Sequence, residues 1–118
     1  MTPIFIYYPK CSTCKNAHKL LEDSGVTLVK RDIVVDTPSS KVLKDIIEKS
    51  GLEFKKFFNT SGMVYRDMGL KDKIKDMTLD EAVELLSSNG MLIKRPILVT
   101  DNKILVGFKK SDYEEIIK

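Results

Sequence analysis

The feature that most constrains this chain is a buried strand that leads almost directly into two cysteines at the start of a helix. Ile4 to Tyr8 is an unbroken apolar and aromatic run, the pattern of a strand buried on both faces of a sheet. Apolar and small residues then recur at helical spacing from Cys14 to Ser24, and Gly25 supplies a left-handed stop. The spacing therefore predicts a helix over 12–24, with Cys11 at its N-terminus.

The middle of the chain predicts a group of helices. Thr27-Leu28-Val29 is a β-branched and apolar run that completes a parallel β-α-β unit. Pro38-Ser39-Ser40 then opens a helix that ends at Gly51. Its expected apolar face contains Val42, Leu43, Ile46 and Ile47. Two shorter helices are expected near 68–75 and over 78–87, the second with a capping box of Thr78 and Glu81.

The last part of the chain predicts a hairpin and a closing helix. Ile97-Leu98-Val99 and Ile104-Leu105-Val106 flank Asp101-Asn102, a pair that tolerates positive φ, so the two runs read as antiparallel strands. A helix over 110–117 follows. The order β-α-β, helices, β-β-α predicts an α/β protein with a thioredoxin-like fold, a four-stranded mixed sheet and a helical insertion at about 39–88.

Composition places the chain in a broad class. A length of 118 residues predicts one domain over 1–118. With 42% apolar and 31% charged residues, a disordered chain and a membrane protein are both disfavoured. Neither a secretory leader nor a basic block is visible, and the net charge is +3. We therefore expect a cytoplasmic, monomeric protein that binds neither nucleic acid nor membrane.

Two cysteines three residues apart, between a strand and a helix of a cytosolic chain, are typical of redox chemistry. Unpaired amides and the helix dipole favour an anion at Cys11, which should lower the pKa of its thiol. Cys14 begins the apolar stripe and should be less exposed. We expect Cys11 to attack an oxidised substrate and Cys14 to resolve the adduct into an internal disulfide. The hydroxyl side chains expected to cradle an anionic part of the substrate are Ser12 and Thr13, and the lysines that add positive charge are Lys10 and Lys15.

Other interpretations of the cysteines remain open. They are small enough to be ordinary helix residues, and His18 lies on the same helical face as Cys14. A closed zinc site, however, needs four ligands, and no second pair exists. His18 by itself is typical of a solvated or capping side chain, with general base catalysis as the alternative. A phosphatase-like thiol site would need an arginine where the chain has Ala17.

A second motif is Lys94-Arg95-Pro96-Ile97. A proline just before a strand near a thiol site suggests a cis peptide that exposes backbone to an extended substrate, which makes Pro96 a candidate substrate contact. Arg95 can point its guanidinium at the Cys11 thiolate or at an oxyanion, or else be a solvated side chain. Asn59-Thr60-Ser61-Gly62 reads as a polar turn that ends a helix, with Gly62 in positive φ.

Taken together, these motifs resemble the arsenate reductase (ArsC)/Spx family, and within it the short YusI-like branch with a C-x-x-C motif. The resemblance covers nearly the whole chain. The matching segments are Tyr8-Pro9-Lys10-Cys11-Ser12-Thr13-Cys14-Lys15-Asn16-Ala17, Phe57-Phe58-Asn59-Thr60-Ser61-Gly62, Tyr65 to Asp72, and Leu92-Ile93-Lys94-Arg95-Pro96-Ile97.

The resemblance implies roles for particular residues. In the glutaredoxin-linked arsenate reductases of this family the nucleophilic cysteine matches Cys11, and an arginine matches Arg95. A further arginine of those enzymes falls where this chain has Asn59, which makes Asn59 a candidate substrate-binding residue. A third arginine of those enzymes lies near the final hairpin, where this chain has Lys103 and Lys109 but no arginine.

The sequence and the resemblance support two functions. The first is a cytosolic thiol-disulfide oxidoreductase with weak arsenate reductase activity. No bound cofactor is expected, and an external reductant such as glutathione, another small thiol, thioredoxin or glutaredoxin would serve it. The alternative is an Spx-like transcriptional regulator, in which the C-x-x-C is a redox switch and the partner is RNA polymerase.

Overall fold

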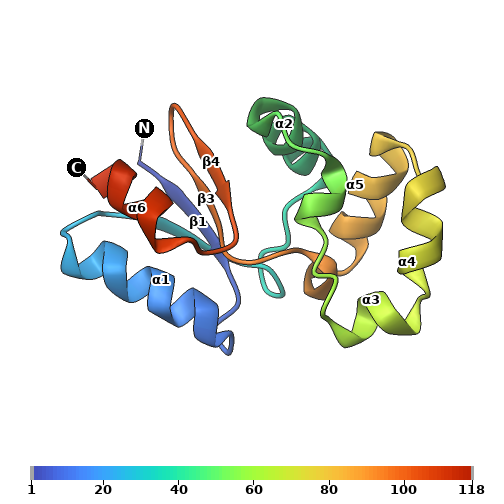
Figure 1. Cartoon of the computed structure of the whole chain (residues 1–118), viewed down its shortest axis with the longest axis horizontal. Helices are drawn as coiled ribbons and strands as arrows, with labels where there is room; N and C mark the ends of the chain where they lie inside the picture. Colours follow the sequence, from blue (N-terminus) through green and yellow to red (C-terminus); the bar gives the residue numbers. More distant parts are fainter. Residues whose placement is uncertain (1, 118) are drawn as a thin grey trace. The chain divides into compact units, whose positions relative to one another are not determined.

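The computed structural model describes residues 2–117 (Figure 1). The elements form two compact units, one of residues 2–32 with 95–117 and one of residues 33–94. The single-domain organisation stays a prediction. Within the described residues, no helix is long and apolar enough to cross a membrane.

The first unit is built on a four-stranded mixed sheet with the strand order β2-β1-β3-β4. β1 (Ile4–Tyr7) pairs in parallel with β2 (Val29–Asp32) and antiparallel with β3 (Ile97–Val99), which pairs antiparallel with β4 (Ile104–Val106). α1 (Ser12–Asp23) connects the two parallel strands, and α6 (Lys110–Ile117) follows β4. This arrangement confirms the predicted thioredoxin-like α/β fold.

The core of the first unit lies between the sheet and its two helices. Phe5 of β1 and Leu98 of β3 are register partners and therefore share one face of the sheet. α1 and α6 contact each other, and in Figure 1 both lie along the sheet. The fully buried side chains of this core are Phe5, Ala17, Leu21, Leu98 and Tyr113. Burying a large apolar side chain is worth about 1.5–3 kcal/mol, so this cluster anchors α1 against β1.

The second unit is helical. Its elements are α2 (Ser40–Ser50), η1 (Phe54–Phe57), α3 (Met63–Asp67), α4 (Leu70–Lys73), η2 (Ile74–Asp76), α5 (Leu79–Ser88) and η3 (Gly90–Leu92). α2 packs against α5 through apolar faces. Local signals predicted these two helices well, because Ser39 caps α2, Gly51 ends it in the left-handed region, and Thr78 and Glu81 form the expected capping box. Val42, however, is 38% exposed rather than part of the buried face.

The second strand was predicted too early. β2 is Val29–Asp32 rather than Thr27–Val29, with Val29 opposite Ile4 and Asp32 opposite Tyr7. β2 is an edge strand, and an edge position tolerates the polar residues that follow Val29 because only one side of the strand is paired within the sheet.

Two predictions of positive φ were wrong. Among the described residues, positive φ occurs only at glycines, so the Asp101-Asn102 turn does not use it. That hairpin is closed instead by Thr100, whose N–H donates to the Lys103 carbonyl at 2.8 Å and whose hydroxyl accepts from the Lys103 N–H at 3.0 Å. Gly62 has φ −82° and stands directly before α3 rather than ending a helix in positive φ. A Cβ at Gly62 would lie 2.7 Å from Nδ2 of Asn59, so close approach explains this glycine.

The helix expected near 68–75 is interrupted. Gly69 has φ 64° and precedes α4, and the last turn changes to the 3-10 helix η2. α3 was not predicted, because a helix of five residues is too short to show a periodic apolar pattern.

Candidate active site

Cys11 occupies the junction between β1 and α1. It is the N-cap of α1, with extended backbone at φ −84° and ψ 118°. Its N–H donates to the Tyr8 carbonyl at 3.0 Å, which fixes the turn out of the strand. Its Sγ accepts a hydrogen bond from the Cys14 N–H at 3.4 Å. That N–H is one of the first amides of a helix, which have no partner within the helix. The sulfur therefore takes the capping role that an oxygen normally has.

The pKa of the Cys11 thiol is lowered by its neighbours. Partial burial alone raises this pKa, because it disfavours the charged thiolate. Hydrogen bonds from the Cys14 amide and thiol, a hydrogen bond from Arg95, and the positive charge of Arg95 outweigh that effect. Cys11 therefore carries more thiolate at neutral pH than an ordinary cysteine, as the sequence predicted.

Cys14 has the opposite character. Its side chain is 1% exposed, and burial is the largest of the causes that raise the pKa of its thiol to about 12. A backbone hydrogen bond from Tyr8 works against this rise, and the hydrogen bond to Cys11 and the negative charge on Cys11 add to it. Both cysteines are free thiols. The pair thus consists of an accessible, acidic thiol and a buried thiol that stays protonated at neutral pH.

Arg95 is held beside the cysteines by an aromatic ring. Its Cζ lies 5.2 Å from the ring centroid of Tyr8, a cation–π contact. The bond between Arg95 and Pro96 is cis, which confirms the prediction for this motif. Pro96 is buried, and its carbonyl accepts from the Gly107 N–H at 2.8 Å. These contacts place the guanidinium within hydrogen-bonding distance of the Cys11 sulfur.

Sequence reasoning missed Tyr8 as part of this site. Tyr8 was interpreted as the end of the apolar strand run, yet its backbone contacts both cysteines and its ring contacts Arg95. An aromatic residue three positions before the C-x-x-C was the only available signal, since its partner Arg95 is far away in the sequence.

The remaining predicted residues divide between the two units. The exposed side chains around the start of α1 are Lys10, Ser12, Thr13 and Lys15. They lie in the same unit as Cys11, Cys14, Arg95 and Pro96. Asn59 belongs to the second unit, where its N–H donates to the Leu92 carbonyl at 2.7 Å.

The His18 side chain contacts an aromatic ring and a carboxylate. Its ring stacks on Phe5 with centroids 5.9 Å apart, and its Nε2 lies 3.4 Å from a carboxylate oxygen of Glu22. Within residues 2–117 no three His, Cys, Asp or Glu side chains are grouped closely enough to hold a metal ion.

Comparison with known proteins places this site in a family. The model of the ArsC family matches residues 6–116. The chain belongs to the ArsC family. The protein YusI of Bacillus subtilis (strain 168) is 50% identical over 115 residues, with 98% of each chain covered. An ArsC family related protein from Bacteroides fragilis has a TM-score of 0.93 at 46% identity, covering 100% of this chain and 98% of the other.

The ArsC family chain also has regulatory relatives. The regulatory protein MgsR of Bacillus subtilis (strain 168) is 26% identical over 114 residues, with 97% of this chain and 89% of MgsR covered. Membership of the ArsC family and the thioredoxin-like fold thus confirm the resemblance found in the sequence.

Proposed function

We propose that this ArsC family chain is a thiol-disulfide oxidoreductase in which Cys11 is the nucleophile and Cys14 the resolving thiol. The observation that supports this most directly is the opposite character of two neighbouring thiols. The pKa of Cys11 is lowered and that of Cys14 is raised to about 12. A reaction in two thiol steps needs this asymmetry, because one sulfur must attack first and the other must wait.

In the first step the Cys11 thiolate attacks one sulfur of a substrate disulfide. A mixed disulfide forms between Cys11 and that sulfur, the substrate disulfide bond breaks, and the other half leaves as a thiolate. Arg95 and the Cys14 amide hold the attacking sulfur in its charged form. The exposed start of α1, with Ser12, Thr13 and Lys15, is the proposed surface for an anionic part of the substrate.

In the second step Cys14 resolves the adduct. Once Cys11 is in a mixed disulfide it carries no negative charge, so two of the causes that raise the Cys14 pKa disappear. The departing thiolate or water takes the Cys14 proton, and Cys14 attacks the Cys11 sulfur. An internal disulfide forms, the bound substrate half leaves, and two electrons have passed to the substrate. An external thiol reductant then restores both cysteines.

Mass spectrometry after mild oxidation tests this mechanism. The expected product is an internal disulfide between Cys11 and Cys14. Cys14→Ser should accumulate a mixed disulfide at Cys11, whereas Cys11→Ser should form none. Recovery of two free thiols in the oxidised wild type, or equal behaviour of the two variants, would sink the proposal. Redox titration with glutathione, another small thiol and thioredoxin identifies the donor.

Arsenate is a second proposed substrate, supported by membership of the ArsC family. Arg95 and the start of α1 suit an oxyanion, and thiols supply the two electrons that reduce arsenate to arsenite. This chain has Asn59 at one arginine position of the reductases described above, and near their third arginine it has lysines, Lys103 and Lys109, but no arginine. We therefore expect slow turnover that depends on Arg95. Turnover as fast as that of a dedicated reductase would contradict this expectation.

The alternative function is a redox-switched regulator, and the observation that favours it is the similarity to MgsR. The same disulfide would then change affinity for RNA polymerase rather than transfer electrons. A tenfold change in affinity requires about 1.4 kcal/mol between the two redox forms. Capture of RNA polymerase by the oxidised form alone would favour the regulator, and equal, negligible capture by both forms would favour the enzyme.

A further inference from the structure

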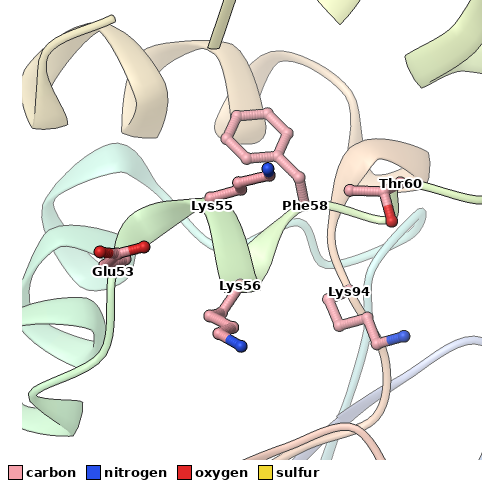
Figure 2. A pocket seen from close by; sticks show the side chains of 6 residues that line it. All are labelled: Glu53, Lys55, Lys56, Phe58, Thr60 and Lys94. Carbon is pink, nitrogen blue, oxygen red and sulfur yellow. The ribbon is translucent and has the colours of Figure 1, made fainter. Parts of the chain in front are cut away.

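The second unit contains a pocket lined by lysines (Figure 2). Its volume is about 380 Å³, within the usual range for small-molecule sites. The lining residues are Glu53, Lys55, Lys56, Phe58, Thr60 and Lys94. Figure 2 shows Lys56 and Lys94 extending to the same side, whereas the Phe58 ring points the other way. The pocket therefore presents charged groups, and the buried Phe58 side chain fixes the backbone beside them.

Backbone hydrogen bonds hold two distant segments of this pocket together. The Lys94 N–H donates to the Phe57 carbonyl at 2.8 Å, and the Asn59 N–H donates to the Leu92 carbonyl at 2.7 Å. An isolated antiparallel bridge joins Phe58 to Ile93 between them. These hydrogen bonds consequently hold the backbone of Lys56 and the backbone of Lys94 at a fixed position relative to each other.

The charges of this pocket are not balanced. Three lysines and one glutamate, Glu53, are among the lining residues, which leaves a formal net charge of +2. In the part of the chain that the structure describes, Lys55, Lys56 and Lys94 make no ion pair and no side-chain hydrogen bond. Other lysines of the same unit are paired: Lys44 lies 2.8 Å from Asp80, and Lys49 lies 3.2 Å from Asp45. An excess of like charges in one pocket favours an anionic ligand.

We propose that this pocket binds a phosphate monoester of a small hydroxylated molecule. A phosphate monoester carries about −1.5 to −2 charges at pH 7, which matches the excess charge of the lining. Lysine binds phosphate as a point charge with three rotatable donors. The Thr60 hydroxyl adds a donor, and the Glu53 carboxylate accepts from a hydroxyl of the ligand. This inference goes beyond the proposed redox reaction, and its test needs no turnover.

NMR titration of the reduced protein with glycerol phosphate tests the assignment. Saturable shifts are expected for the amides of 54–60 and 94, and they should weaken as salt screens the lysines. The double variant Lys56→Gln/Lys94→Gln should bind at least about tenfold more weakly, a change of about 1.4 kcal/mol. Lys71→Gln/Lys75→Gln removes the same number of charges from exposed positions of the same unit and should bind like the wild type.

Several outcomes would overturn the proposal. Equal binding of acetate, or tighter binding of succinate, would show that a phosphate is not selected. Shifts confined to residues 11–15 that persist in Lys56→Gln/Lys94→Gln would place the anion at α1 instead. Equal weakening of binding in both double variants would show that binding depends on the net charge of the protein and not on this pocket. The charge reversal Lys56→Glu is a second variant, and it should abolish the shifts while leaving the dispersion of the remaining spectrum unchanged.

Discussion

Replacing Arg95 by leucine should make Cys11 less reactive at neutral pH. Arg95 donates a hydrogen bond to the Cys11 sulfur and places a positive charge beside it, and both effects lower the pKa of that thiol. A thiol loses a proton to become reactive, so the loss of a neighbouring cation raises its pKa and lowers the thiolate fraction below that pKa. The reactivity of Cys11 should therefore fall at neutral pH and recover at high pH.

The size of this effect follows from the contacts. A hydrogen bond to a charged group contributes about 1.5–3 kcal/mol when buried. Cys11 is partly exposed, so solvent screening reduces this to about 1–1.4 kcal/mol. Since 1.36 kcal/mol is a factor of ten, the rate of alkylation at pH values below both midpoints should fall about five- to tenfold.

The assay is the pH dependence of Cys11 alkylation by iodoacetamide in a Cys14→Ser background. Arg95→Leu should move the midpoint to higher pH and leave the plateau rate unchanged. Arg95→Lys retains a charge but not the planar guanidinium, so the midpoint of its pH profile should lie between those of the wild type and Arg95→Leu. Arg66→Leu removes an equal charge from an exposed position of the second unit and serves as the matched control. An Arg95→Leu profile that superimposes on that of Arg66→Leu would refute the reasoning.

Substitutions at Tyr8 and at Gly90 test two further contacts of the structure. Tyr8→Leu should slow Cys11 alkylation at neutral pH about two- to fivefold, because a cation–π contact worth about 0.5–1 kcal/mol at a partly exposed site is lost, whereas Tyr8→Phe should retain it. A profile of Tyr8→Phe as perturbed as that of Tyr8→Leu would assign the effect to the hydroxyl instead. Gly90→Ala should destabilise the protein by more than about 3 kcal/mol in urea unfolding, since its Cβ would overlap the Ile33 carbonyl. Gly25→Ala, at φ 77° with open space around it, should cost only about 1 kcal/mol, and equal losses would contradict the packing argument.

The sequence alone was sufficient for features that depend on neighbouring residues. The bounds of α1, α2 and α5 follow from caps and apolar spacing, which act within one or two turns. The C-x-x-C after a buried strand likewise predicted the acidic Cys11 and the buried Cys14, because the helix start and the apolar stripe are local properties.

Only the tertiary structure decided features that join distant segments. The residues of β2 are set by backbone pairing with β1, a pairing that begins at Val29, and not by the apolar run of residues that precedes it. Tyr8 meets Arg95, and Lys56 shares a pocket with Lys94, through contacts between segments far apart in the chain. Local pattern contains no information about such pairs, since each partner looks like an ordinary strand end or a solvated side chain until the fold brings them together.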